Sequence, residues 1–183
     1  LKRDQRSKEV IVMKPFSASF TLSNPSSSCW KILSIAGVGG TKSALDTLKK
    51  ISSFGGFWQV FPVRSVASFS HLAWAAYSTV SSLESKSTHY SQPELEFLSR
   101  VSGYRQWKRA KEKAGVEPHD LVVVVAWVGP STGLSESEFV RFSKKWGLKA
   151  KKVEWGADVL PPPHWGVDKS SFAFEQSALV EIE

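Results

Sequence analysis

The chain has 183 residues, a formal net charge of +7 and a single cysteine, Cys29. This length suits one domain with a sizeable core, and 42% hydrophobic against 22% charged residues excludes wholesale disorder. No apolar run approaches the roughly 20 residues of a membrane-spanning helix, no signal peptide is visible, and no Cys/His spacing indicates zinc. We therefore expect a cytoplasmic domain with no metal, no cofactor and no membrane segment.

The first part of the chain divides into an extension and the start of a domain. Residues 1–28 read as an N-terminal extension with one strand and a Ser/Pro-rich linker, and residues 29–183 as a single domain. Residues 30–35 alternate loosely and predict a strand. A glycine-rich loop follows, and Thr41 is a plausible N-cap of a helix. Residues 57–61 predict a short aromatic strand that ends at Pro62.

Helical patterns dominate the middle of the chain. Apolar residues recur at helical spacing over residues 65–83. Pro93 suits the first position of a helix that Gly103 ends, and a second helix is predicted from residue 104 to 114, with Gly115 as its stop.

The last part mixes strands with one further helix. A valine-rich strand is predicted over 121–128, and Ser135 with Glu138 forms a capping box for a helix that ends near Trp146. Further strands are expected at 153–159 and 177–182. The pattern has no repeats and no strict alternation of strand and helix. It predicts an α/β (α+β) fold, a single domain with a mixed β-sheet packed against several helices.

Positive charge is concentrated in two blocks. Residues 100–113 contain six cations and one acid, Glu112, and residues 144–152 contain five lysines and no acid. Such clustering raises the local electrostatic potential and favours a polyanionic partner. A solvated face of ordinary helices is the alternative interpretation.

The helix predicted at 104–114 carries the first block beside aromatic residues. A buried stripe of Trp107, Ala110 and Ala114 would leave Arg105, Lys108, Arg109 and Glu112 outward. Cations beside tryptophan and tyrosine are typical of surfaces that follow phosphates and stack bases. About five phosphate contacts would give single-stranded binding a log–log salt slope near −3.5. An amphipathic surface helix without a ligand explains the same pattern.

Two features raise the alternative of a small enzyme that acts on a phosphate-bearing substrate. The stretch at residues 37–43 follows a strand, but Thr41 separates Gly40 from Lys42, so the consecutive Gly-Lys-Ser/Thr of a phosphate loop is missing. His71 offers a base, but it lies on an apolar helical stripe, where a buried histidine is the usual outcome. No nucleophile or paired carboxylate stands in a catalytic pattern. The sequence therefore predicts no catalytic residue.

Two stretches, residues 65–77 and 93–116, resemble the kinase-associated, tRNA-binding small subunit of the KEOPS complex, the TPRKB family. The resemblance rests on the order of His71 and Leu72, a small-residue helix, the 93–116 block and a valine-rich strand. The recognisable positions of the family pattern are His71, Gly103, Gln106, Ala110 and Gly115. Residues 176–181 are similar to the closing strand of archaeal members. Trp107 and Lys111 depart from the pattern, because the family commonly has aliphatic residues there.

The resemblance implies a non-catalytic role in threonylcarbamoyl-adenosine modification of tRNA. The subunit would bind the small atypical kinase of the complex and capture tRNA through its single-stranded CCA end. The expected RNA contacts are Arg64, Arg105, Lys108 and Arg109, beside an apolar cleft for unstacked bases. The expected kinase contacts are Leu72, Trp74 and Tyr77, for each of which core packing is the alternative. A protein-only adaptor without RNA contact stays open as a third interpretation.

Overall fold

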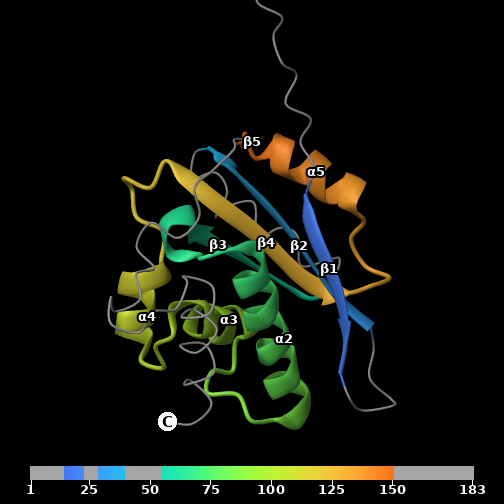
Figure 1. Cartoon of the computed structure of the whole chain (residues 1–183), viewed down its shortest axis with the longest axis vertical. Helices are drawn as coiled ribbons and strands as arrows, with labels where there is room; N and C mark the ends of the chain where they lie inside the picture. Colours follow the sequence, from blue (N-terminus) through green and yellow to red (C-terminus); the bar gives the residue numbers. More distant parts are fainter. Residues whose placement is uncertain (1–14, 23–28, 40–54, 151–183) are drawn as a thin grey trace, which may run out of the picture.

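The computed structural model describes residues 15–22, 29–39 and 55–150. Within these ranges the chain forms one sheet with helices on both faces (Figure 1). The strands are β1 (Phe16–Thr21), β2 (Cys29–Val38), β3 (Phe57–Pro62), β4 (Val122–Pro130) and β5 (Lys149–Ala150). The helices are α2 (Phe69–Ser85), α3 (Pro93–Ser102), α4 (Trp107–Ala114) and α5 (Glu136–Lys145), with a 3₁₀ turn, η2 (Val63–Ser65), after β3.

The sheet has the strand order β1-β2-β4-β3, and β5 pairs with the end of β2. Each pairing among the described strands is antiparallel. The α+β fold class is thus confirmed, while the parallel neighbours that a mixed sheet would include are not found in these ranges. A parallel neighbour requires a crossover connection between paired strands. Here the chain passes through α2, α3 and α4 between β3 and β4, and β4 returns in the opposite direction.

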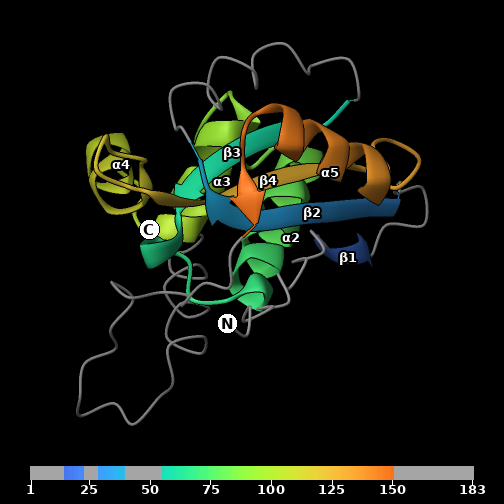
Figure 2. The same ribbon diagram turned by 90° about the horizontal axis from the view of Figure 1, so that it is seen from above.

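Side chains alternate between the two faces of the sheet and form two cores. In Figure 2, α5 lies over one face of the sheet, and α2 and α3 lie over the other. On one face Ile32 and Val124 pack with residues of α2 and α3, and on the other face Leu33 and Val125 pack with residues of α5. β4 lies between β2 and β3 and is buried on both faces, so a near-continuous apolar run is the sequence that this strand requires.

Several helix ends agree with the capping signals of the sequence. Pro93 begins α3, and Gly103 ends it in the left-handed region at φ 72°. The capping box of Ser135 and Glu138 is present at the start of α5. The helix predicted from residue 65 begins only at Phe69, because η2 and an extended segment precede it and the Ser68 side chain caps it by accepting the His71 N–H.

Part of the predicted N-terminal extension belongs to the sheet. β1 pairs with β2 along its whole length, from Phe16 opposite Ser34 to Thr21 opposite Cys29. Leu22 is buried in the core on the α2 side, and Ala18 and Phe20 pack against that core. The helix expected from Thr41 and the strands expected at 153–159 and 177–182 lie outside the described residues.

Candidate nucleic-acid interface

The α4 helix lies at the periphery of the molecule (Figures 1 and 2). Lys108, Arg109 and Lys111 are exposed on it. Tyr104, in the turn before the helix, is 38% exposed, and Trp107 is 44% exposed. Accessible aromatic rings of this size offer flat apolar faces on which a planar ligand can stack.

The exposure of Trp107 corrects the sequence-based expectation that it belongs to a buried stripe. Only Ala110 and Ala114 of that stripe are buried, at 1% and 0% exposure. The two alanine side chains are the buried residues of α4. Trp107 is the first residue of the helix, and its indole is partly exposed to solvent. Helical periodicity gave the correct face, but it could not show where along the helix the contact with the core ends.

Two hollows flank the exposed side of α4. The first has a volume of about 340 Å³ and is lined by Tyr104, Arg109, Glu112 and Lys113. The second has a volume of about 360 Å³ and is lined by Trp107, Lys108, Lys111, Glu112, Val116 and Glu117. Each hollow therefore combines one accessible aromatic ring with cations, and Glu112 borders both. We call this set of residues the α4 surface.

A buried ion pair anchors the segment that leads into the α4 surface. Glu96 and Arg100, one turn apart on α3, are 0% and 1% exposed, and their side chains lie 3.0 Å apart. Arg100 also donates to the Ser82 hydroxyl at 2.6 Å, which joins α3 to α2. Arg100, one of the six cations of the first basic block, therefore contributes to the interior and not to the surface charge.

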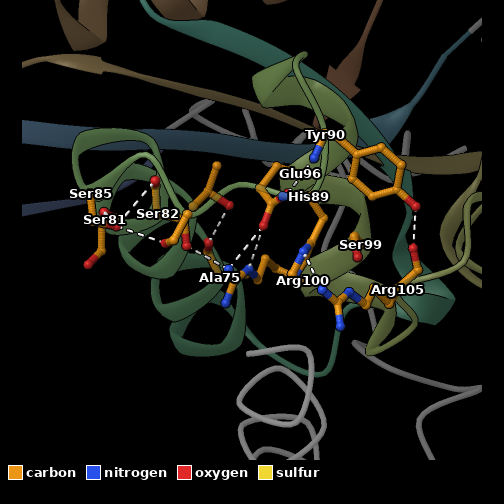
Figure 3. A network of polar contacts seen from close by, with 12 residues as sticks. Ala75, Ser81, Ser82, Ser85, His89, Tyr90, Glu96, Ser99, Arg100 and Arg105 are labelled. Carbon is orange, nitrogen blue, oxygen red and sulfur yellow. Dashed lines mark hydrogen bonds and ion pairs between the residues drawn. The ribbon is translucent and has the colours of Figure 1, made fainter. Parts of the chain in front are cut away.

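The same carboxylate holds the loop that contacts Arg105. Glu96 Oε2 accepts the backbone N–H groups of His89, at 3.0 Å, and Tyr90, at 3.2 Å. The Tyr90 hydroxyl donates to the Arg105 carbonyl, and the Arg105 guanidinium lies 2.8 Å from His89 Nδ1 (Figure 3). Burial, followed by the charge of Glu96, raises the pKa of Tyr90, so its hydroxyl is a donor at neutral pH. The network thus fixes the backbone at Arg105 and leaves that side chain half-buried.

Serine side chains fix the backbone of Tyr104. The Ser99 hydroxyl donates to the Tyr104 carbonyl at 2.8 Å, and Ser102 Oγ accepts the Tyr104 N–H at 3.1 Å. Gln106, one of the positions of the family pattern, is exposed and its side chain makes no capping hydrogen bond at the start of α4. The i,i+4 spacing of Glu96 and Arg100 on a helix with buried neighbours was the available sequence signal for this network, which was not predicted.

Arg64, in the 3₁₀ turn η2, is paired with a carboxylate. Its Nε lies 2.8 Å from Asp120 Oδ1, and Asp120 Oδ2 accepts the Glu117 N–H at 2.7 Å. Burial raises the pKa of Asp120, but the hydrogen bonds from Arg64 and Glu117 and the charge of Arg64 outweigh it, so the pKa lies below its usual value. The structure therefore places Arg64 in a pair that closes the turn after α4, whereas Lys108 and Arg109 remain outward.

Gly115 ends α4 as the sequence predicts, through close approach of the backbone. Its N–H donates to the Lys111 carbonyl at 2.8 Å. A Cβ at this position would lie 2.4 Å from the Lys111 oxygen, so only glycine fits.

Two residues behind the enzyme alternative, His71 and Gly37, lie inside the fold. His71 is 1% exposed and accepts the Ala67 N–H at Nδ1, and burial lowers its pKa to about 4, so the ring is neutral at pH 7. Gly37, expected in a loop, lies in β2 opposite Val123, where a Cβ would come 2.4 Å from the Lys149 carbonyl oxygen. Residues 40–43 lie outside the described residues.

The three expected kinase contacts divide between core and surface. Leu72 is 0% exposed and belongs to the core on the α2 side. Trp74 is 42% exposed and stacks on the half-buried Tyr77, with ring centroids 5.6 Å apart. Both rings line a groove of about 740 Å³ between α2 and β1, whose lining residues are Ala18, Ser19, Phe20, Phe69, Ser70, Ala73, Trp74 and Tyr77.

The second basic block begins on α5, on the opposite face of the sheet from α2 and α3. Arg141, Lys144, Lys145 and Lys149 are exposed there, and Arg141 lies over the Phe142 ring. Trp146, which ends this helix, is buried against Trp58. This block therefore has cations at the surface but keeps its tryptophan in the interior, unlike the α4 surface.

Comparison with protein-family models gives no match, and comparison with curated proteins gives none either. Among residues 15–22, 29–39 and 55–150, no helix has the length and apolar character that crossing a bilayer requires. The same part of the chain contains no group of three or more histidine, cysteine and carboxylate side chains arranged to hold a metal ion.

Proposed function

We propose that the chain is a non-catalytic, cytoplasmic subunit of a tRNA-modifying complex of the KEOPS type, and that it binds the single-stranded CCA end of tRNA on the α4 surface. The observation that carries the proposal is the combination of two accessible aromatic rings, Tyr104 and Trp107, with three exposed cations on one short helix and the turn before it. The cations are Lys108, Arg109 and Lys111. Single-stranded nucleic acids are bound by this combination, because aromatic rings stack unpaired bases and cations follow the phosphates.

The geometry supports an unpaired end over a duplex. Each hollow beside α4 holds about 340 to 360 Å³ next to one aromatic ring, a size that suits a base and part of its ribose. Bases within a helix are stacked and cannot enter such a hollow, whereas the last nucleotides of tRNA are unpaired. The rigid turn that holds Tyr104 and Arg105 lowers the entropic cost of ordering the site on binding.

The partner side of the proposal rests on the groove between α2 and β1. Trp74 and Tyr77 offer stacked, partly accessible rings in an apolar groove, which is typical of a protein contact. We assign this groove to the small atypical kinase and exclude Leu72 from the contact, since it is fully buried.

Electrophoretic mobility shift of deacylated tRNA, with and without its CCA end, tests the RNA proposal. The trimmed tRNA is expected to bind at least about tenfold more weakly, because each lost stacked base costs about 1–3 kcal/mol. Equal affinity for both tRNAs would exclude capture of the CCA end.

Charge reversal locates the RNA site. The triple variant Lys108→Glu, Arg109→Glu and Lys111→Glu is expected to lose RNA binding and to stay folded, since these side chains are exposed. The matched control is Arg141→Glu, Lys144→Glu and Lys145→Glu on α5, which changes the net charge equally and should retain CCA-dependent binding. The opposite result would move the site to the second basic block.

A pull-down with purified kinase tests the protein contact separately from RNA. Trp74→Ala with Tyr77→Ala should abolish co-purification and leave tRNA binding unchanged. If the wild-type chain is folded and fails to retain the kinase, the assignment to a KEOPS-type complex is wrong.

A further inference from the structure

Glu112 is a carboxylate in the middle of the basic α4 surface. Lys108, Arg109, Lys111 and Lys113 all lie within four residues of it, and Glu112 is exposed. It borders both hollows, the one beside Tyr104 and the one beside Trp107. Despite the cations around it, its carboxylate makes no hydrogen bond or ion pair with the described part of the chain.

A carboxylate at this position opposes binding of a phosphate backbone, because the two charges repel. It becomes favourable only where the ligand presents hydrogen-bond donors. Adenine and cytosine present an exocyclic amino group, and guanine presents an amino group beside a ring N–H. Uracil presents two carbonyl oxygens around a single N–H, and both oxygens would face the carboxylate unfavourably.

We infer that Glu112 selects nucleotides whose base carries an amino group and rejects uracil. A base stacked on Tyr104 or on Trp107 lies in a hollow that Glu112 borders, so one carboxylate can meet base edges from either side of the helix. The inference rests on the proposed RNA binding and deepens it. Every base of the CCA end carries an amino group, so whichever base of that end occupies either hollow can donate to Glu112.

The experiment uses fluorescence anisotropy with short labelled oligoribonucleotides that share a 5′ sequence and end in either CCA or UUU. The wild-type chain should bind the CCA-ended oligonucleotide about tenfold more tightly, the discrimination expected from well-formed contacts to a base edge. In Glu112→Gln the two affinities should approach each other, with the larger change a gain for UUU. The glutamine removes the repulsion and can donate to a uracil oxygen.

Glu136→Gln is the matched control, since Glu136 is exposed on α5 and its loss changes the net charge equally. It should leave the CCA-to-UUU ratio unchanged. If the wild type binds both oligonucleotides equally, or if Glu112→Gln keeps the wild-type ratio, Glu112 does not select the base and the RNA-binding proposal stands alone. If the wild type binds neither oligonucleotide, both proposals are overturned.

Discussion

At the scale of single residues, burial decides what each ionisable side chain does. Arg100 and His71 are both 1% exposed, and each has a defined partner: Glu96 for the arginine and the Ala67 N–H for the histidine. Neither is available to a ligand at the surface. The exposed Lys108 and Arg109 keep their charge in solvent, where a polyanion can reach it.

The buried His71 predicts a loss of stability in mild acid. Its pKa is lowered to about 4 in the folded chain, whereas an unfolded histidine titrates near 6.5. Between pH 6.5 and pH 4 the unfolded state therefore binds a proton at His71 that the folded state does not bind. The free energy of unfolding falls over this range by about 3 kcal/mol in total. Urea unfolding of the wild type at a series of pH values measures this loss.

His71→Asn isolates this contribution from other acid effects. The asparagine side-chain oxygen can accept the Ala67 N–H in place of Nδ1 and does not titrate. The stability difference between wild type and variant should therefore shrink by about 2 to 3 kcal/mol between pH 7 and pH 4.5. A constant difference would show that His71 does not resist protonation.

At the scale of elements, helices and strands could be predicted from the sequence better than the contacts between them. Pro93, Gly103, and the Ser135–Glu138 box are local signals that act within one turn, and each has the expected place. The exposure of Trp107 and the pairing of Arg64 with Asp120 depend on residues distant along the chain. Periodicity assigns a face to a side chain but cannot name what lies opposite, and the candidate site was therefore predicted only in part.

Tyr90 should affect RNA binding without touching the RNA, because its hydroxyl holds the turn before α4. Tyr90→Phe removes the donor to the Arg105 carbonyl and keeps the ring, so the start of α4 should lose its fixed position. We expect several-fold weaker tRNA binding with a change in unfolding free energy of only about 1 kcal/mol.

Ser85→Ala is the control for this effect, since it removes a hydroxyl that donates to the Ser81 carbonyl on α2. RNA affinity, measured by anisotropy, should be unchanged in this variant. Equal affinity of Tyr90→Phe and wild type would contradict a positioning role for the loop at residues 89–90.

At the scale of the whole molecule, the total of 24 lysine and arginine residues overstates the number of cations available to RNA. The described structure commits Arg100 to Glu96 and Arg64 to Asp120, which leaves Lys108, Arg109 and Lys111 as the exposed cations of α4. The fold class followed from the sequence, because it depends on the order of elements. The surface charge did not, because it depends on which cations meet carboxylates in the folded chain.

This count changes the expected salt dependence of RNA binding. About three phosphate contacts predict a log–log slope near −2 for single-stranded RNA, less steep than the −3.5 expected from about five. Titrations of a CCA-ended oligoribonucleotide at several potassium chloride concentrations measure the slope. A slope of −3.5 or steeper would mean that further cations, such as those of α5, take part.

The attachment of α4 through Ala110 and Ala114 has a consequence for motion. Burying two methyl groups contributes far less than the aromatic and aliphatic packing of β4, so α4 can open while the sheet stays intact. Its backbone amides should exchange with deuterated solvent long before those of β4. Binding of an RNA end to the α4 surface should then slow amide exchange in α4 and leave exchange in β4 unchanged.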